Sequence, residues 1–372
     1  MKHIEQCRTA ALGGHVDECD TCGHVKISYN SCRDRHCPKC QSLKKAEWLD
    51  RRLGRLLPVA YSHVVFTIPD ELNPVTFRNK QVVYNILFRA ASETLMTIAA
   101  ERKCLGAEIG FTAILHTWGQ NLLFHPHLHC VATAGGLAPS GKRWVRARGN
   151  FFLPVRVLAR LFRGKFLHHL TEARRQGRLC FEGSTAALAG SKAFRRFVNT
   201  LYRKAWVVYA KPPFGGAEHV FHYLGRYTHR VAISNGRLVE MKDAKVSFAV
   251  KDYVDGCRQK ILTLQAVEFI RRFLLHVLPK RFIRIRHFGL MAGRNVTEKL
   301  PRCRRLLAPH APEPPPPTGQ PKPKKTWQER VLELTGIDPR ECPRCSEGMM
   351  RRQTVLSPVR GLAPAASGID SS

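Results

Sequence analysis

Two histidines, His127 and His129, flank a single leucine, Leu128. On a β-strand, successive side chains alternate between the two faces, so both imidazoles project from one face and Leu128 from the other. Neutral imidazoles bind divalent cations, and burying a pair of them without a partner costs free energy. The spacing therefore predicts a metal site. His125, which precedes Pro126, is either a further ligand or a residue at the start of the strand.

Two tyrosines, Tyr223 and Tyr227, have the i, i+4 spacing that brings side chains together on one face of a helix. Arg226 and Arg230 repeat at the same interval on a neighbouring face, where guanidinium groups would bind phosphate beside the phenols. A helical tyrosine can also pack in a core with its hydroxyl bonded locally, and the spacing alone favours that simpler interpretation.

The thirteen cysteines are clustered, which indicates metal ligation more than disulfides. Two Cys-x2-Cys pairs, separated by fourteen residues, have the spacing of a closed, structural four-cysteine zinc site. The ligands predicted for this site are Cys19, Cys22, Cys37 and Cys40. Cys7, Cys32 and His36 in the same stretch provide a possible second zinc site, unless the two cysteines are small buried side chains.

The charge of the chain points to a polyanionic partner. Lys and Arg number 61 against 28 Asp and Glu, which gives a formal net charge of +33 over 372 residues. Such a field favours DNA or RNA. We find no apolar run long enough to span a membrane and no signal peptide, so we expect a cytoplasmic protein with no membrane partner. The length of the chain predicts two or three domains. We expect no nucleotide cofactor.

Hydrophobic periodicity indicates the elements that must position these residues. Strands are predicted at 61–68, 109–118 and 127–134, a strand meander at 231–250, and helices at 42–56, 79–100, 217–230 and 267–278. The helix at 42–56 is rich in cations and resembles a DNA-binding element. The segment 280–288 alternates basic and apolar residues, so we expect a strand whose cationic face, with Arg284 and Arg286, is turned to nucleic acid.

Taken together, these motifs resemble the two-tyrosine rolling-circle HUH transposases of the insertion sequence 91 family, which carry an N-terminal zinc-binding domain. The resemblance spans most of residues 7–307 and rests on five segments. They are Cys7–His15, Ser31–Cys40, the histidine run, Tyr223–Asn235 and Arg284–Gly289. Relatives usually have a longer segment before Cys7. We therefore expect either that the first residue of the chain is assigned too late or that the copy is truncated.

The resemblance implies an α+β fold, an HUH-nuclease-like antiparallel sheet with packed helices, preceded by a small N-terminal zinc-binding module. The expected domains are a zinc-binding, DNA-binding module at 1–58, the HUH transposase domain at 59–307, a Pro/Lys-rich linker at 308–326 and a C-terminal segment at 327–372 with a disordered tail. Cys342 and Cys345 in that segment offer half a zinc site, which either borrows ligands from elsewhere or is a remnant of a lost ribbon.

The resemblance also implies a reaction. His127 and His129 would hold Mg²⁺ or Mn²⁺, with a third ligand left open among Gln120, Glu218 and His222. A tyrosine would attack the scissile phosphate of single-stranded DNA at the ends of a mobile element and form a 5′-phosphotyrosine, so the bond can be rejoined. When bound to DNA, the protein would be associated with a bacterial nucleoid.

Two alternatives remain at this stage. One is a non-catalytic or decayed zinc-dependent DNA-binding protein. The other is a hydrolytic metalloenzyme, although the acidic residue expected after its histidine pair is missing, because Cys130 and Val131 stand there. The oligomeric state is not predicted.

Overall fold

The computed structural model describes residues 2–147, 153–211, 232–252, 255–256, 258–308 and 325–359. These residues form two compact units, each described by itself. The terminal unit contains the described residues up to Asp50, those at 232–235, and those from 325 onward; the sheet unit contains the remainder. Among the described residues, no helix is both long and apolar enough to cross a membrane.

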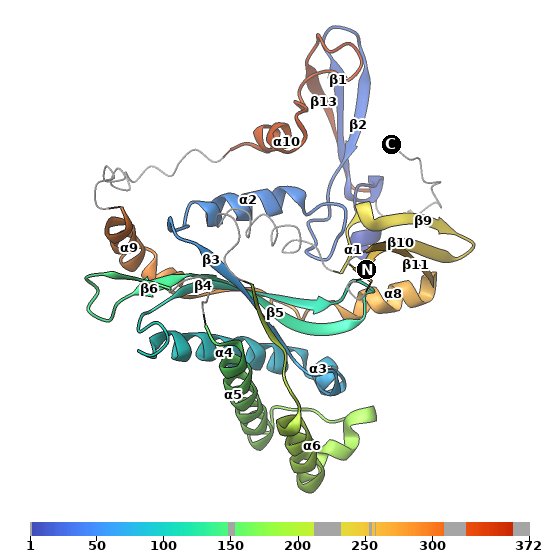
Figure 1. Ribbon diagram of the computed structural model, residues 1–372. Helices are drawn as coiled ribbons and strands as arrows, with labels where there is room; N and C mark the ends of the chain where they lie inside the picture. The colour runs from blue at the N-terminus through green and yellow to red at the C-terminus, as the bar shows by residue number, and fades with distance from the viewer. Residues whose placement is uncertain are drawn as a thin grey trace. The chain divides into compact units, whose positions relative to one another are not determined.

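The terminal unit is built on a three-stranded antiparallel sheet that combines both ends of the chain (Figure 1). Strand β1 (Gly14–Cys19) lies between β2 (Val25–Tyr29) and β13 (Met350–Leu356). The helices of this unit are α1 (Lys2–Glu5), the 3-10 turn η1 (Ala10–Leu12) and α10 (Trp327–Thr335), and α2 (Ser42–Leu53) begins in it. The segment 327–372, expected to be separate from the zinc module, thus shares a sheet with it through its described residues.

The sheet unit contains a five-stranded antiparallel sheet, with strand order β12-β4-β5-β3-β8. In chain order its strands are β3 (Tyr61–Thr67), β4 (Gly110–Trp118), β5 (Phe124–Thr133), β8 (Val208–Lys211) and β12 (Ile285–Gly289). The mixed helix and antiparallel-sheet class expected from the sequence, with a small N-terminal module, is confirmed.

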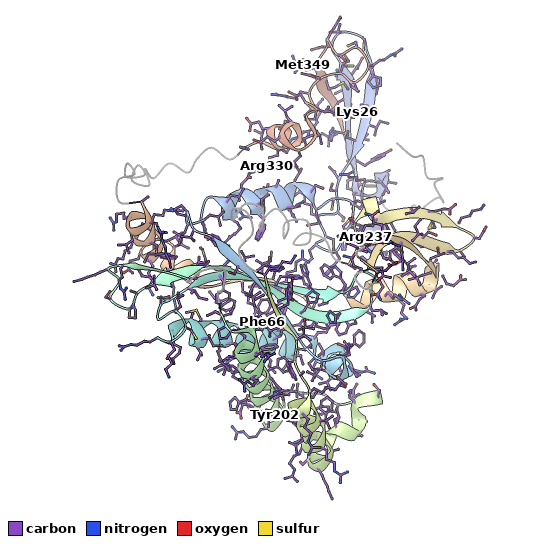
Figure 2. All side chains as sticks on the ribbon, viewed as in Figure 1. Lys26, Phe66, Tyr202, Arg237, Arg330 and Met349 are labelled. Carbon is purple, nitrogen blue, oxygen red and sulfur yellow. The ribbon has the colours of Figure 1, made fainter. Side chains whose placement is uncertain are left out.

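One face of this sheet carries the main hydrophobic core. Helices α4 (Lys80–Ala100) and α5 (Val155–Arg175) lie on that side (Figure 1). Phe66 is fully buried there, and its ring centroid lies 4.9 Å from that of Phe162 (Figure 2). Alternation along β5 turns Leu128 and Cys130 into this core. His127 and His129, which alternate with them, therefore project from the opposite face.

The predicted helices recur with slightly different ends. The predicted helices 42–56, 79–100 and 267–278 are observed as α2, α4 and α8 (Ala266–Leu275). The meander consists of β9 (Leu238–Lys242), β10 (Lys245–Asp252) and β11 (Arg258–Gln265), whereas residues 232–234, expected to be a strand, are irregular. The remaining elements are η2 (Asp70–Leu72), α3 (Asn73–Arg78), β6 (Gly135–Leu137), β7 (Trp144–Arg146), η3 (Gly183–Ala189), α6 (Ser191–Arg203), η4 (Asn235–Arg237), η5 (Gly293–Asn295) and α9 (Lys299–Leu307).

Three predicted features lie outside the described residues. The first is the whole helix predicted at 217–230, with Tyr223, Tyr227, Arg226 and Arg230 and with Glu218 and His222. The second is the linker, of which 309–324 is not described, and the third is the tail from 360 onward.

Candidate metal and catalytic sites

A cluster of histidines lies on the face of the sheet opposite the hydrophobic core. His127 and His129 project together from β5, and their Nε2 atoms are 3.0 Å apart. His116 on the adjacent strand β4 stands directly opposite His127 in the strand register. One ring nitrogen from each of the three histidines lies within 4.8 Å of the others. The predicted pair is thus joined by a third imidazole that the sequence analysis missed.

Hydrogen bonds orient the two rings of the pair. His127 donates from Nδ1 to the backbone carbonyl of His125 at 2.6 Å, so its Nε2 carries the lone pair. Nδ1 of His129 lies 2.8 Å from Nε2 of His63 on β3, and the two rings stack at a centroid distance of 5.0 Å. When His129 donates in that contact, both facing Nε2 atoms present lone pairs, an arrangement that suits a shared cation.

Burial keeps these imidazoles neutral. Burial lowers the pKa of His127 to about 4, and it lowers the pKa values of His116 and His129 well below the usual range. The pKa of His63 also falls to about 4, through burial and, to a lesser degree, the charge of Lys211. Neutral imidazole is the form that ligates a metal, so the donors are ready near pH 7.

The turn between β4 and β5 is held by side chains from a distant part of the sequence. Three consecutive backbone carbonyls of this turn each accept a hydrogen bond from a side chain. Arg237 donates to Gln120 O at 2.6 Å, Arg272 to Asn121 O at 3.0 Å and His276 to Leu122 O at 3.0 Å (Arg237 is labelled in Figure 2). Because the turn connects the two strands that carry the histidines, these bonds fix the hairpin beneath the cluster.

The other candidate ligands have different environments. Gln120 lies in the β4–β5 turn, and it remains a candidate. The His125 side chain is 41% exposed and lies 3.7 Å from Asp70, so its contribution to the cluster is its carbonyl. His116 was detectable in principle, because the predicted strands 109–118 and 127–134 form a hairpin in which it faces the histidine pair.

The cysteine-site prediction is wrong in its grouping. Cys19, Cys22, Cys37 and Cys40 do not form one set of four. Among the described residues, two separate sets occur, Cys7 with Cys32, Cys37 and Cys40, and Cys19 with Cys22, Cys342 and Cys345. The physical reason is that Cys19 ends β1, after which β2 carries the chain back along the sheet before Cys32. The pairs Cys19/Cys22 and Cys37/Cys40 are therefore held apart by the length of β2, a strand that rises about 3.3 Å per residue.

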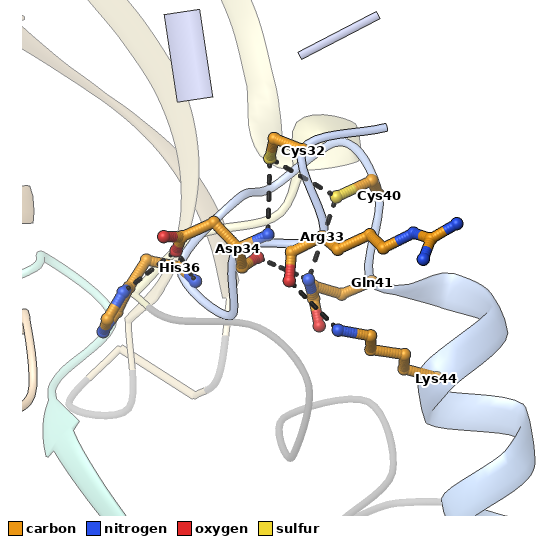
Figure 3. Close-up of polar contacts among 7 residues, drawn as sticks. All are labelled: Cys32, Arg33, Asp34, His36, Cys40, Gln41 and Lys44. Atoms are coloured by element: carbon orange, nitrogen blue, oxygen red, sulfur yellow. Dashed lines mark hydrogen bonds and ion pairs between the residues drawn. The ribbon is translucent and has the colours of Figure 1, made fainter. Parts of the chain in front are cut away.

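The first set has the geometry of a closed metal site. The sulfur atoms of Cys32 and Cys40 are 3.8 Å apart, and a tetrahedral ion with Zn–S bonds of about 2.3 Å implies about 3.8 Å. Figure 3 shows the backbone N–H of Asp34 donating to the Cys32 sulfur at 3.4 Å. His36, a predicted possible ligand, is outside the set, and its Nδ1 lies 3.1 Å from the Asp34 carboxylate.

Two family models match the chain. Residues 110–299 match the model described as a putative transposase, and residues 1–68 match the model described as a transposase zinc-binding domain. The chain belongs to the insertion sequence 91 family of transposases. The zinc-binding domain agrees with a structural zinc ion at the first cysteine set.

Relatives of the transposase match almost its whole length. It is 54% identical over 361 residues to putative transposase y4qJ of Sinorhizobium fredii, with coverage of 97% of this chain and 90% of the relative. It is 28% identical over 375 residues to the transposase for insertion sequence element IS801 of Pseudomonas savastanoi pv. phaseolicola, with coverage of 98% and 85%.

Among solved structures, the transposase is similar to the conjugative relaxase TrwC in complex with oriT DNA, in a metal-free structure. The identity is 12%, the TM-score is 0.25, and the match covers 45% of this chain and 71% of the relaxase. A score this low does not by itself define a shared fold.

The expected cationic strand face is not formed by Arg284 and Arg286. Arg284 is 8% exposed. The Arg286 guanidinium packs over the Phe88 ring at 4.2 Å and donates to Asn85 Oδ1 at 2.6 Å, and burial lowers its pKa. The reason is that β12, the edge strand beside β4, lies against α4, so the Arg286 side chain packs on residues of that helix.

Proposed function

We propose that this transposase cuts and rejoins single-stranded DNA at the ends of its mobile element through a 5′-phosphotyrosine intermediate. The observation that carries the proposal is the cluster of His116, His127 and His129, three neutral imidazoles whose ring nitrogens converge from two adjacent strands. Membership in the transposase family supplies the DNA substrate class.

The histidines are suited to holding Mg²⁺ or Mn²⁺ against a phosphate. Such an ion, when bound, polarises the scissile phosphate and stabilises the negative charge that develops on its oxygens. Three imidazole nitrogens leave coordination positions for phosphate oxygens or water, as a hard cation requires. Outside the cluster, His63 holds the ring of His129, and the carbonyl of His125 holds that of His127.

Tyr223 and Tyr227 are the proposed nucleophiles. The phenolate oxygen of one tyrosine forms a bond to phosphorus, the bond from phosphorus to the 3′ oxygen breaks, and the departing strand takes up a proton as a free 3′-hydroxyl. Attack by a 3′-hydroxyl reverses these changes and releases the tyrosine, so rejoining needs no ATP. The second tyrosine would act on another strand while the first is still linked. Arg226 and Arg230 would favour the phenolate, because an unperturbed phenol has a pKa near 10.

A covalent adduct is the product to measure. Labelled single strands that tile the element's ends are incubated with the purified transposase and Mg²⁺ or Mn²⁺, then separated under denaturing conditions. We expect an adduct with the wild type and with Tyr202→Phe, a variant of an exposed tyrosine on α6 (Figure 2), and none with Tyr223→Phe/Tyr227→Phe.

The other outcomes separate the competing functions. DNA binding without any adduct, in the wild type as in the double variant, would instead indicate a non-catalytic DNA-binding protein. Release of a free 5′-phosphate without an adduct would indicate hydrolysis at the histidines.

A further inference from the structure

Cys342 and Cys345 lie beside the first cysteine knuckle, although they are more than three hundred residues away in the chain. Cys19 Sγ is 3.7 Å from Cys345 Sγ, and Cys22 Sγ is 3.7 Å from Cys342 Sγ. The zinc-binding family model ends at residue 68 and includes neither of the C-terminal cysteines. We propose that these four cysteines bind a second Zn²⁺, which clasps the C-terminal segment to the N-terminal module.

The sulfur geometry fits a tetrahedral thiolate site. Both sulfur–sulfur distances between the two pairs equal, within about 0.1 Å, the edge of a tetrahedron with Zn–S bonds of about 2.3 Å. They are far longer than the roughly 2.05 Å of a disulfide, and all four cysteines are free thiols. The four sulfur atoms lie within 4.8 Å of one another, so one ion can contact all of them.

Both pairs have the backbone arrangement of a zinc knuckle. At the first pair, the N–H groups of Thr21 and Cys22 each donate to the Cys19 sulfur at 3.4 Å. At the second, the N–H of Arg344 donates to the Cys342 sulfur, also at 3.4 Å. Such bonds stabilise a thiolate and leave its remaining lone pairs for a metal.

The second knuckle repeats the pattern at its other cysteine. There the N–H of Gly348 donates to the Cys345 sulfur at 3.4 Å. Two independent Cys-x2-Cys turns, each with its own N–H to sulfur bonds, therefore face each other across the site. Chance proximity of four cysteines would not require this shared backbone form.

Contacts around the sulfurs hold the two knuckles in register. Strand β13 pairs antiparallel with β1, and this pairing places Met350 opposite Cys19. Asp20 accepts from the backbone N–H of Met349 at 2.7 Å, and it forms an ion pair with Arg351 at 3.2 Å (Met349 is labelled in Figure 2).

Gly348 shows how closely the knuckles approach. A Cβ atom at this position would lie 2.4 Å from the Cys19 sulfur and 2.6 Å from the Thr21 hydroxyl oxygen. Only glycine fits there unless these side chains shift. The C-terminal knuckle therefore packs directly against the first knuckle.

Zinc content tests the proposal directly. The measurement uses the full-length protein with His127→Ala/His129→Ala, which removes zinc binding at the histidine cluster, and every further variant is made in this background. Refolded with Zn²⁺ and freed of excess metal, this protein should contain two zinc ions per chain. Cys342→Ser/Cys345→Ser should contain one, because Cys7, Cys32, Cys37 and Cys40 retain theirs. The control Cys104→Ser/Cys180→Ser, in cysteines outside both sets, should keep two. One zinc ion in the His127→Ala/His129→Ala background, or an unchanged content when Cys342→Ser/Cys345→Ser is added to it, would overturn the proposal.

A cut chain tests the clasp even if the cysteine variant misfolds. A protease recognition sequence is inserted at 318–319, and the wild-type chain is cleaved there after folding. The C-terminal fragment should co-elute with the rest of the protein in zinc and separate when a chelator removes the metal. Co-elution that a chelator does not disturb, or separation in the presence of zinc, would contradict the clasp.

Gly348→Ala supplies a second variant for the cut chain. It should weaken retention of the fragment, whereas Gly293→Ala, where a Cβ meets no atom within 4 Å, should not. Equal retention in both variants would count against the fit of the two knuckles. Neither readout depends on DNA cleavage, so the clasp and the proposed reaction can fail separately.

Discussion

In the histidine cluster of the transposase, some residues are candidate metal ligands and others orient those ligands. His127 and His129 are the predicted ligands, and the structure adds His116 from the neighbouring strand and His63 behind His129. A residue that orients a ligand usually changes metal affinity more than the maximal rate, because it does not touch the reacting atoms. This distinction gives His63 a test of its own.

His63→Ala should raise the Mn²⁺ concentration needed for half-maximal adduct formation by about 10- to 100-fold, because His129 loses its orienting contact. The rate at saturating Mn²⁺ should fall much less. Metal titration of the adduct assay measures both quantities. His168→Ala, a variant of an exposed histidine on α5, serves as the control and should match the wild type. A fall in the saturating rate with an unchanged metal requirement would contradict the orienting role.

At the scale of elements, local periodicity predicted most of the sheet unit. The strands β3, β4 and β5 and the helix α4 follow from alternation and from a 3.6-residue repeat, which depend only on neighbouring residues. The β12 prediction failed because alternation of basic and apolar residues does not reveal which face meets solvent. The Arg286 guanidinium instead contacts the Asn85 amide and the Phe88 ring of α4.

His276, which follows α8, binds the β4–β5 turn of the histidine hairpin, and its burial predicts that stability depends on pH. Its Nε2 donates to Leu122 O, its Nδ1 lies 3.2 Å from the Thr117 hydroxyl, and burial lowers its pKa from 6.5 to about 4. The unfolded state therefore takes up a proton first as pH falls. The contribution of neutral His276 to stability is complete above pH 6.5 and is lost between pH 6.5 and about 4.

His276→Gln should therefore flatten the fall in the free energy of unfolding between pH 6.5 and 4, relative to the wild type. Denaturant titrations across that range measure the slope. The exposed-residue variant His168→Gln should keep the wild-type slope. If His276→Gln also keeps it, the buried neutral state of His276 is wrong.

The contact of α4 with the sheet predicts a large packing effect. Leu95 on α4 is fully buried, so Leu95→Ala should lower the free energy of unfolding by about 2–5 kcal/mol through lost burial and a cavity. Leu238→Ala, at a leucine 41% exposed on β9, should cost less than about 1 kcal/mol. The midpoint of denaturant unfolding compares the two variants, and equal losses would mean that α4 is not part of the core.

At the scale of the whole molecule, the two ends of the chain form one unit. This arrangement was not predictable from the sequence, because pairing of β13 with β1 has no local signal and the N-terminal cysteines alone have the spacing of a complete site. The register of β13 with β1 depends on how their side chains pack and on the close approach at Gly348. The spacing of residues along the sequence reveals neither of these. The tyrosine pair remains a prediction, since it lies outside the described residues.

The net charge of +33 predicts strongly salt-dependent DNA binding. Each phosphate neutralised on a single strand contributes a slope of about −0.7 in log affinity against log salt, so six contacts would cost about 300-fold between 50 and 200 mM salt. Fluorescence anisotropy with a labelled strand measures this slope. His129→Ala should share it, because it leaves the basic residues unchanged, and an affinity insensitive to salt would rule out phosphate binding as the main attraction.

The most direct test of the reaction is to find the residue that becomes linked to DNA. Trypsin cleaves after Arg226, so Tyr223 and Tyr227 fall in different peptides, and Tyr227 lies in 227–230. The adduct is digested with nuclease and trypsin, and the peptide that carries the residual nucleotide is sequenced by mass spectrometry. We predict a 5′-nucleotide on the phenol oxygen of Tyr223 or Tyr227. Attachment to any other residue, or cleavage that leaves no residue modified, would contradict the account.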